Sequence, residues 1–213
     1  MNSVPHIGHA FEFILGDAIS KYLKASNKVH FNIGLDEHGL KVWSKSQELN
    51  ISPEEHINNL TTLWKEFCEK FDIQYDSFYK TSDSTHHGKV KIIWQRFVDR
   101  GDIYKKSYSG NYCVGCESFK SDKELIDGKC QDHPTTEITI VNEENYFFKL
   151  SHYKEALSEW IESNPTFLEP KNKLDELRNL IDGSEDISIS RLRKNCPWGV
   201  SVPNDDDQVI YVW

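Results

Sequence analysis

Apolar residues recur along the first fifty positions with periods that alternate between helix and strand. Over residues 8–25, spacing at i, i+3 and i+4 predicts an amphipathic helix. The apolar face of that helix consists of Phe11, Ile14, Leu15, Ala18 and Tyr22. The stretch 28–34, Lys-Val-His-Phe-Asn-Ile-Gly, predicts a short buried strand, and a helix of about ten residues follows through Val42 and Leu49.

A third helix has a strongly marked start at Ser52-Pro53-Glu54-Glu55. Ser52 suits the N-cap, proline suits the first turn, and Glu55 can complete a capping box. Its apolar stripe consists of Ile57, Leu60, Trp64, Phe67 and Phe71. A strand over 77–81 and a helix that ends at Gly101 continue the alternation, which favours a parallel α/β sheet.

The pattern changes near residue 105. Cysteines and short turns occupy 108–137, a strand-like Tyr-Phe-Phe lies at 146–148, and a helix follows with an apolar face. Residues 209–213 form a continuous apolar run that is typical of a strand covered on both faces. We therefore expect an α/β domain in two parts, 1–104 and 186–213, separated by an insertion over 105–185.

The composition narrows the class of protein. Thirty-four acidic residues against 25 basic ones give a net charge of −9, which argues against non-specific coating of nucleic acid. No apolar run approaches the roughly 20 residues of a membrane span, and no signal peptide opens the chain. These features predict a soluble, cytoplasmic protein with no membrane partner.

A metal site is indicated by Cys113-Val-Gly-Cys116 and, after thirteen intervening residues, Cys130-Gln-Asp-His133. Three thiolates and one imidazole at this spacing suit a closed, tetrahedral, structural Zn²⁺ site, and Gly115 and Gly128 would help the chain turn around it. The alternatives are a redox pair or two unrelated pairs. The two remaining cysteines, Cys68 and Cys196, are expected to be buried in the core.

The tetrad His6-Ile7-Gly8-His9 lies at the start of the first predicted helix. Free backbone N–H groups and the positive end of the helix dipole attract an anion there, and imidazoles can donate to phosphate oxygens. Gly8 allows a base or phosphate to approach the backbone closely. The alternative is a pair of surface histidines near a helix start.

A carboxylate follows the first predicted strand in Gly34-Leu35-Asp36-Glu37-His38-Gly39. Ligands of open α/β sheets bind beyond the carboxyl ends of strands, so Asp36 can meet the ammonium group of a small substrate. The alternative role for an aspartate at this place is the N-cap of the next helix.

These motifs together resemble the methionyl branch of the class I aminoacyl-tRNA synthetases. The tetrad resembles the HIGH signature, Asp36-Glu37-His38-Gly39 resembles the DEHG segment, and the tail segments 186–191, 197–200 and 202–203 resemble the return of the chain to the nucleotide-binding sheet. The resemblance implies a Rossmann-type nucleotide-binding domain of the HIGH superfamily, interrupted by a connective-peptide insertion with a zinc knuckle at about 108–137.

The resemblance also implies roles for particular residues. His6, Gly8 and His9 would cradle ATP, which arrives with Mg²⁺, and Asp36 would hold the α-amino group of methionine. Arg191 would support the active site near Asp36 as an ion pair, keeping that carboxylate charged. Val212 and Trp213 match the start of the segment that lines the methionine pocket.

The implied activity is ATP-dependent conversion of L-methionine to methionyl-adenylate, followed by transfer to tRNA(Met), by a monomer. The strand before the tetrad, the KMSKS loop and the anticodon-binding domain lie outside these 213 residues, so we expect a fragment whose own adenylate formation is severely depressed. Two alternatives stay open. One is another nucleotidyltransferase with a HIGH-type tetrad, and the other is a catalytically incompetent, zinc-stabilised module that binds tRNA or protein.

Overall fold

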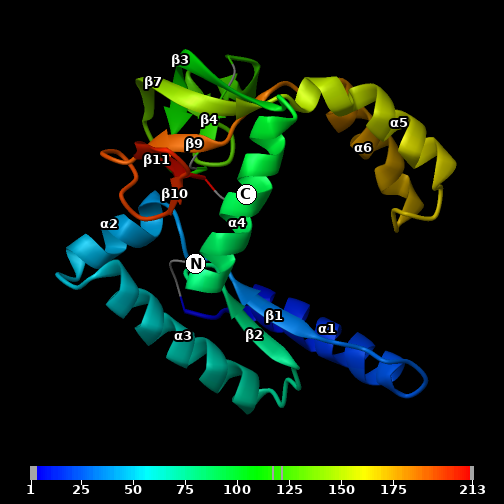
Figure 1. Ribbon diagram of the computed structural model, residues 1–213. Coiled ribbons are helices and arrows are strands. Elements are labelled where there is room, and N and C mark those ends of the chain that lie inside the picture. The colour runs from blue at the N-terminus through cyan, green and yellow to red at the C-terminus, as the bar shows by residue number, and fades with distance from the viewer. Residues whose placement is uncertain (1–3, 117, 121, 212–213) are drawn as a thin grey trace. The chain divides into compact units, whose positions relative to one another are not determined.

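The chain forms two compact units in its computed structural model, which describes residues 4–116, 118–120 and 122–211 (Figure 1). The first unit holds the described residues up to Ile92 and those from Arg193 onward, and the second holds Ile93–Leu192. The boundaries predicted at 104/105 and 185/186 stay predictions, since compact units need not coincide with domains. Within the described residues, no helix is long and apolar enough to cross a membrane.

The first unit is built around two parallel strands. Its elements are α1 (Ile7–Lys24), β1 (Asn32–Leu35), α2 (Leu40–Glu48), α3 (Pro53–Lys70), β2 (Ser77–Lys80), the beginning of α4 (Ser84–Asp99), β10 (Val200–Val202) and β11 (Asp205–Ile210). Asn32 lies opposite Ser77 and Leu35 opposite Lys80. Because the carboxyl ends of parallel strands meet at one edge, the residues after Leu35 and those after Lys80 come together.

The core of this unit lies on one face of β1. Ile33 and Leu35 point to the same face by the period-two rule, and both are buried. Around them pack Phe13 from α1 and a set of α3 residues, namely Leu60, Trp64, Phe67 and Cys68. Ser52 caps α3, because its hydroxyl accepts a hydrogen bond from the backbone N–H of Glu55 at 3.0 Å. Ser52 as the N-cap, Pro53 in the first turn and the buried Cys68 are thus as predicted, and Cys196 is buried as well.

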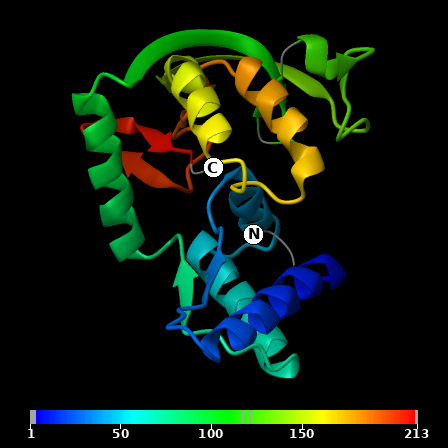
Figure 2. The same cartoon turned by 90° about the vertical axis from the view of Figure 1, so that its right-hand side faces the viewer.

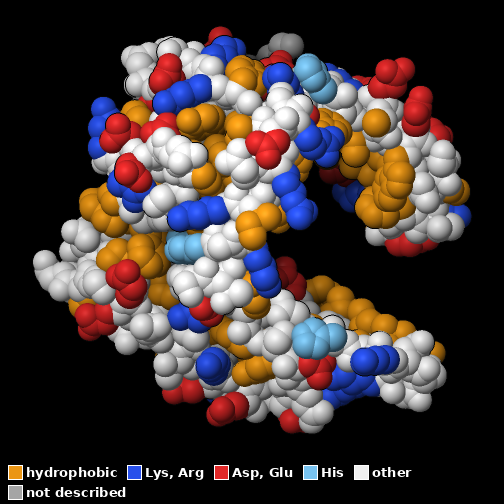
Figure 3. Space-filling view, in the orientation of Figure 1, with side chains coloured by type: hydrophobic (Ala, Val, Ile, Leu, Met, Phe, Trp, Pro, Cys, Tyr) orange, Lys and Arg blue, Asp and Glu red, His pale blue; other side chains and the backbone are white. Residues whose placement is uncertain are grey.

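Helix α1 forms where predicted, but its apolar face is exposed. Phe11 is 69% exposed and Tyr22 is 80% exposed, and apolar side chains run along α1 in Figure 3. The buried positions are Ala10, Asp17 and Ser20. A polar contact holds the buried face of α1 in place. Asp17 accepts a hydrogen bond from the backbone N–H of Gln74 at 2.9 Å and forms an ion pair with Lys21.

Two strands differ from their predicted extents. β1 begins at Asn32 rather than at residue 28. Before the strand pairing begins, the backbone N–H of Phe31 donates to the Asp76 carboxylate, and the Phe31 carbonyl oxygen accepts from the backbone N–H of Asp76. β11 contains the buried Val209 and Ile210, but it belongs to an antiparallel hairpin with β10. The other end of the predicted run, Val212 and Trp213, lies outside the described residues.

The second unit contains a long antiparallel ribbon. Its elements are the end of α4, β3 (Ile103–Cys113), β4 (Ser118–Lys120), β5 (Leu125–Ile126), β6 (Lys129–Cys130), β7 (Ile138–Phe148), α5 (Lys154–Ser163), α6 (Leu174–Asp182), β8 (Ile187–Ser188), β9 (Ser190–Leu192) and short 3₁₀ turns at Asp122–Glu124, Leu150–Tyr153 and Lys171–Lys173. The sheet order is β4-β3-β7-β8, and Figure 2 shows β3 as a long bent ribbon. Of the strands in this sheet, only the end of β7 was predicted, whereas α5 and the end of α4 lie where helices were predicted.

Candidate functional site

The two histidines of the tetrad form the cap of α1. His6 is the N-cap, and its Nδ1 accepts a hydrogen bond from the backbone N–H of Gly8 at 3.1 Å. In return, Nδ1 of His9 accepts a hydrogen bond from the backbone N–H of His6 at 3.2 Å, and the two rings stack with centroids 3.7 Å apart. The arrangement is a capping box made by imidazoles.

This cap fixes which nitrogen of each ring carries the proton. Because Nδ1 is the acceptor in both rings, a neutral imidazole here carries its proton on Nε2. Burial, and next the neighbouring His6, lower the pKa of His9 below its ordinary value, so His9 is neutral at pH 7. The start of α1 therefore holds two Nε2–H groups that the cap does not use. These donors, the exposed backbone and the helix dipole all suit an anion.

The cap is connected to β1 through the core. The ring of His9 meets Trp64 edge to face, with centroids 4.6 Å apart, and Trp64 packs in the same cluster as Leu35, the last residue of β1. Asp36 follows Leu35 directly and is exposed. The N-cap of α2 is Gly39, with φ +106°, so Asp36 does not serve as that cap. The alternative role for Asp36 is thereby removed.

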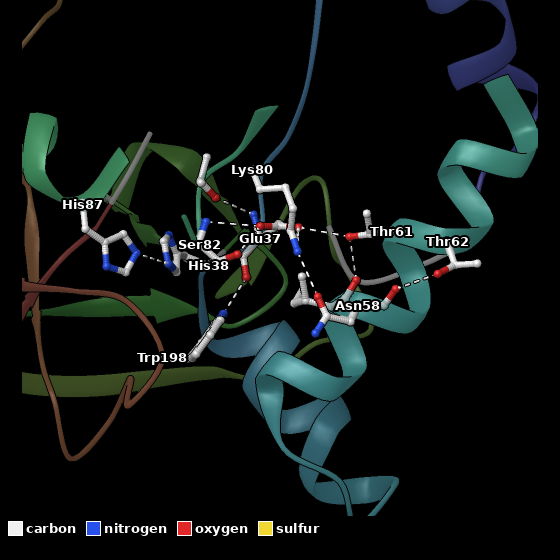
Figure 4. A network of polar contacts seen from close by, with 11 residues as sticks. Glu37, His38, Asn58, Thr61, Thr62, Lys80, Ser82, His87 and Trp198 are labelled. Atoms are coloured by element: carbon white, nitrogen blue, oxygen red, sulfur yellow. Dashed lines mark hydrogen bonds and ion pairs between the residues drawn. The ribbon is translucent and has the colours of Figure 1, made fainter. Parts of the chain in front are cut away.

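Glu37 is the residue of this loop whose importance the sequence did not reveal. Its side chain is fully buried, and Figure 4 shows it at the centre of a polar network. Its partners come from three other places in the chain: Thr61 of α3, the segment 80–82 after β2, and Trp198. A signal was present, since the pairing of parallel strands places the ends of β1 and β2 side by side.

His38 lies next to this network, against His87 and Trp198. Nε2 of His38 is 3.3 Å from Nε2 of His87, and the His38 and Trp198 ring centroids are 5.6 Å apart. Burial, followed by the charges of His87 and His86, lowers the pKa of His38 to about 4. Two close imidazoles are compatible with this packing only while at least one is neutral.

Acidification should therefore weaken the first unit. Between about pH 6.5 and pH 4, the unfolded chain binds a proton at His38 that the folded chain does not, so the free energy of unfolding falls as pH falls through this window. His38 should account for at most about 3 kcal/mol. Urea denaturation at pH 7, 6, 5 and 4 measures the slope, which should shrink in His38→Gln and persist in the exposed control His152→Gln. Equal slopes in all three proteins would contradict the assignment.

Arg191 belongs to the second unit, and its described contacts are there. Its guanidinium donates to the carbonyl oxygen of Ser190 at 2.7 Å and to the hydroxyl of Ser188 at 3.0 Å, and it lies over the Phe119 ring. The predicted support of Asp36 by Arg191 stays a prediction. So do the roles of Val212 and Trp213, which lie outside the described residues.

Four potential metal ligands meet at one point of the second unit. The ligand atoms of Cys113, Cys116, Cys130 and His133 all lie within 4.8 Å of one another. Cys116 Sγ is 3.4 Å from Cys130 Sγ and 3.2 Å from His133 Nδ1, separations near those that a tetrahedral ion with bonds of about 2.0–2.3 Å requires. A Cβ at Gly115 would lie 2.4 Å from the His133 ring, so only glycine allows this approach.

Comparison with known proteins assigns the family. The model of the family described as class I tRNA synthetases (M) matches residues 1–140 and 122–213. This chain belongs to that family. The methionine–tRNA ligase of Streptomyces coelicolor is 39% identical over 224 residues, which cover 100% of this chain and 41% of that protein. The methionyl-tRNA synthetase of Mycobacterium tuberculosis bound by methionyl-adenylate has a TM-score of 0.92 at 36% identity, over 100% of this chain and 43% of that one.

The class I synthetase assignment confirms the family resemblance and the α/β catalytic fold. The chain spans about two fifths of the length of these relatives. A chloroplastic/mitochondrial methionine–tRNA ligase from Arabidopsis thaliana also matches 100% of this chain, at 37% identity. A nucleotidyltransferase of another kind, or a binding module without catalysis, is therefore not favoured.

Proposed function

We propose that this chain carries the methionine- and ATP-binding part of a methionine–tRNA ligase, which forms methionyl-adenylate and transfers the methionyl group to tRNA(Met). The observation that carries the proposal is the pairing, within one unit, of an anion-binding helix start with an exposed carboxylate at the end of β1. One site suits phosphate and the other an ammonium group, which are the charged ends of ATP and of an amino acid.

The residues would act by binding and orientation. The Nε2–H groups of His6 and His9 would donate to phosphate oxygens of ATP, which arrives as its Mg²⁺ complex, while Asp36 would hold the α-ammonium of methionine. A carboxylate oxygen of methionine then attacks the α-phosphorus, and the bond to pyrophosphate breaks. In the second step a ribose hydroxyl of tRNA attacks the carbonyl carbon and AMP leaves.

Methionine-dependent exchange of pyrophosphate into ATP tests the proposal directly. Because the KMSKS loop lies outside these 213 residues, exchange should be severely depressed. What remains should depend on L-methionine and not on L-leucine, because only the unbranched thioether matches the pocket of this family. Exchange with another amino acid alone, or no binding of methionine at any concentration, would overturn the proposal. As a participant in translation, the protein would act in the cytoplasm.

The HIGH-type role of the tetrad gives a prediction for Gly8. A Cβ there would lie 3.0 Å from Cε1 and 3.2 Å from Nδ1 of His6, so Gly8→Ala should displace the ring that caps α1. Alanine favours the helix by about 0.5–1 kcal/mol, which offsets the weakened cap, so stability should change by less than about 1 kcal/mol. ATP affinity should nevertheless fall about tenfold or more, as the Nε2–H donor moves.

Equilibrium dialysis with ATP and urea denaturation measure the two effects. Gly88→Ala is the matched control, because Gly88 also lies in a helix and a Cβ there meets nothing within 4 Å. Unchanged ATP affinity in Gly8→Ala would contradict the proposed role of the tetrad.

The Cys/His cluster fits a structural Zn²⁺, held by Cys113, Cys116, Cys130 and His133. The donor set is the one zinc prefers, and the approach allowed by Gly115 leaves all four ligand atoms facing one point. The backbone N–H of Cys116 also lies 3.5 Å from Cys113 Sγ, as a donor to a thiolate would. When bound, the ion would supply folding energy rather than chemistry, since four protein ligands leave no open position.

A further inference from the structure

The carboxylate of Glu37 is the point where three segments of the first unit meet. Its Oε2 accepts hydrogen bonds from the backbone N–H of Ser82 at 3.1 Å and from the Ser82 hydroxyl at 2.6 Å. Its Oε1 lies 3.8 Å from the ammonium of Lys80. The hydroxyl of Thr61 is 3.4 Å away, a weaker contact, because its single proton also faces the carbonyl oxygen of Ile57 at 2.8 Å.

The backbone of Glu37 is held as firmly as its side chain. Its N–H donates to the hydroxyl of Thr81 at 2.9 Å, and its carbonyl oxygen accepts from the indole N–H of Trp198 at 2.6 Å. Both peptide groups of residue 37 are therefore fixed, one toward the end of β2 and one toward Trp198 (Figure 4). The peptide group that joins Asp36 to Glu37 is one of the two.

We propose that Glu37 is a positioning residue, which holds Asp36 in place for the α-ammonium group of the amino-acid substrate. The inference rests on the proposed function of Asp36. Asp36 is exposed and lies in a loop of four residues between β1 and α2. Its neighbour Glu37 is fully buried and bonded to Thr61 of α3, to the segment 80–82 and to Trp198, so the loop can move little at this point.

The charge of Glu37 matters as well as its shape. Two donors of Ser82 and the ammonium of Lys80 face its two oxygens, and a buried carboxylate is stable only when it is matched in this way. Glutamine keeps the volume of the side chain but presents an NH₂ group toward one of these donors. Glu37→Gln should therefore shift the loop without emptying the core.

The test measures selectivity for the ammonium group. Calorimetry gives the dissociation constants of L-methionine and of the analogue in which hydrogen replaces the α-ammonium. The dissociation constant of the analogue divided by that of L-methionine should fall by between about fivefold and a hundredfold in Glu37→Gln. The reason is that a small displacement of Asp36 weakens a charge-assisted contact steeply. Glu48→Gln is the matched control, since Glu48 pairs with Lys45 at 2.8 Å on the surface, and its ratio should equal that of the wild type.

The outcomes separate this inference from the function on which it rests. If Asp36→Asn lowers the ratio and Glu37→Gln does not, the positioning role is overturned and the function stands. If Glu37→Gln weakens both ligands equally, its role is only structural and the proposal is also overturned. If the wild type does not prefer methionine to the analogue, the proposed function of Asp36 fails instead. Should Glu37→Gln not fold, Ser82→Ala removes one donor to Oε2, and its ratio should fall by about twofold or more.

Discussion

Cys130→Ser should abolish zinc binding and unfold the Cys/His cluster of the second unit. The elements around the cluster are small, since β5 and β6 contain two residues each, and such a hairpin is not stable by itself in water. The free energy of zinc binding at a structural site is about 10 kcal/mol or more, and in a small module it is folding free energy. The free energy lost with one buried thiolate should therefore exceed the stabilisation that the remaining contacts of the cluster supply.

Elemental analysis and hydrogen exchange measure this result. The wild type should contain one zinc per chain and protect the amides of residues 113–133, whereas Cys130→Ser should contain close to none and exchange rapidly there. Cys196→Ser is the control, because Cys196 is buried outside the cluster and its thiol faces the carbonyl oxygen of Trp198, to which a serine hydroxyl can donate. A wild-type protein purified without zinc would contradict the metal assignment, and so would a variant that retains it.

Asp36→Asn should weaken methionine binding by between about tenfold and a hundredfold while leaving stability nearly unchanged. The variant keeps the size of the side chain and removes the charge that would face the ammonium group, and a hydrogen bond to a charged group contributes about 1.5–3 kcal/mol. Asp36 is exposed and is not the N-cap of α2, and substitutions at exposed positions change stability little.

Calorimetric titration with L-methionine gives the affinity, and thermal unfolding without ligand gives the stability. Asp72→Asn serves as the control, since the Asp72 side chain is 83% exposed and its positive φ of 50° suits asparagine. Undiminished methionine affinity in Asp36→Asn would remove the ammonium-binding role. A large drop in melting temperature would show instead that the carboxylate supports the fold.

The sequence revealed those parts of the fold that local rules control. The start of α3 followed from Ser52 and Pro53, and the Cys/His cluster followed from the spacing of its four residues. The ribbon of β3 and β7 did not, because buried polar residues interrupt the apolar pattern of β7. Glu143 and Asn145 lie inside, where the Asn145 amide donates a hydrogen bond of 3.0 Å to the Glu143 carboxylate. Local patterns cannot show that two polar side chains will be partners.

The candidate site likewise has one part that the sequence reveals and one part that it does not. His6, Gly8, His9 and Asp36 are recognisable because their chemistry lies in short motifs. The network of Glu37 joins residues 24 to 161 positions apart, and only the pairing of β1 with β2 and the return of the chain at Trp198 bring them together. The exposed face of α1 shows the converse, since a helical period indicates which residues share a face but not whether that face is covered.

The exposed apolar face of α1 also affects the tendency of the protein to self-associate in solution. Its large apolar side chains in contact with water are Ile7, Phe11, Ile14, Leu15, Ile19, Tyr22 and Leu23. Contiguous apolar surface of this kind promotes self-association, and like charge on neighbouring molecules opposes it. With a net charge of −9, the chain has repulsion to keep copies apart at neutral pH, and acid or high salt removes it. On acidification the protein should therefore aggregate before it unfolds. The urea denaturations at different pH values should for this reason be measured at low protein concentration.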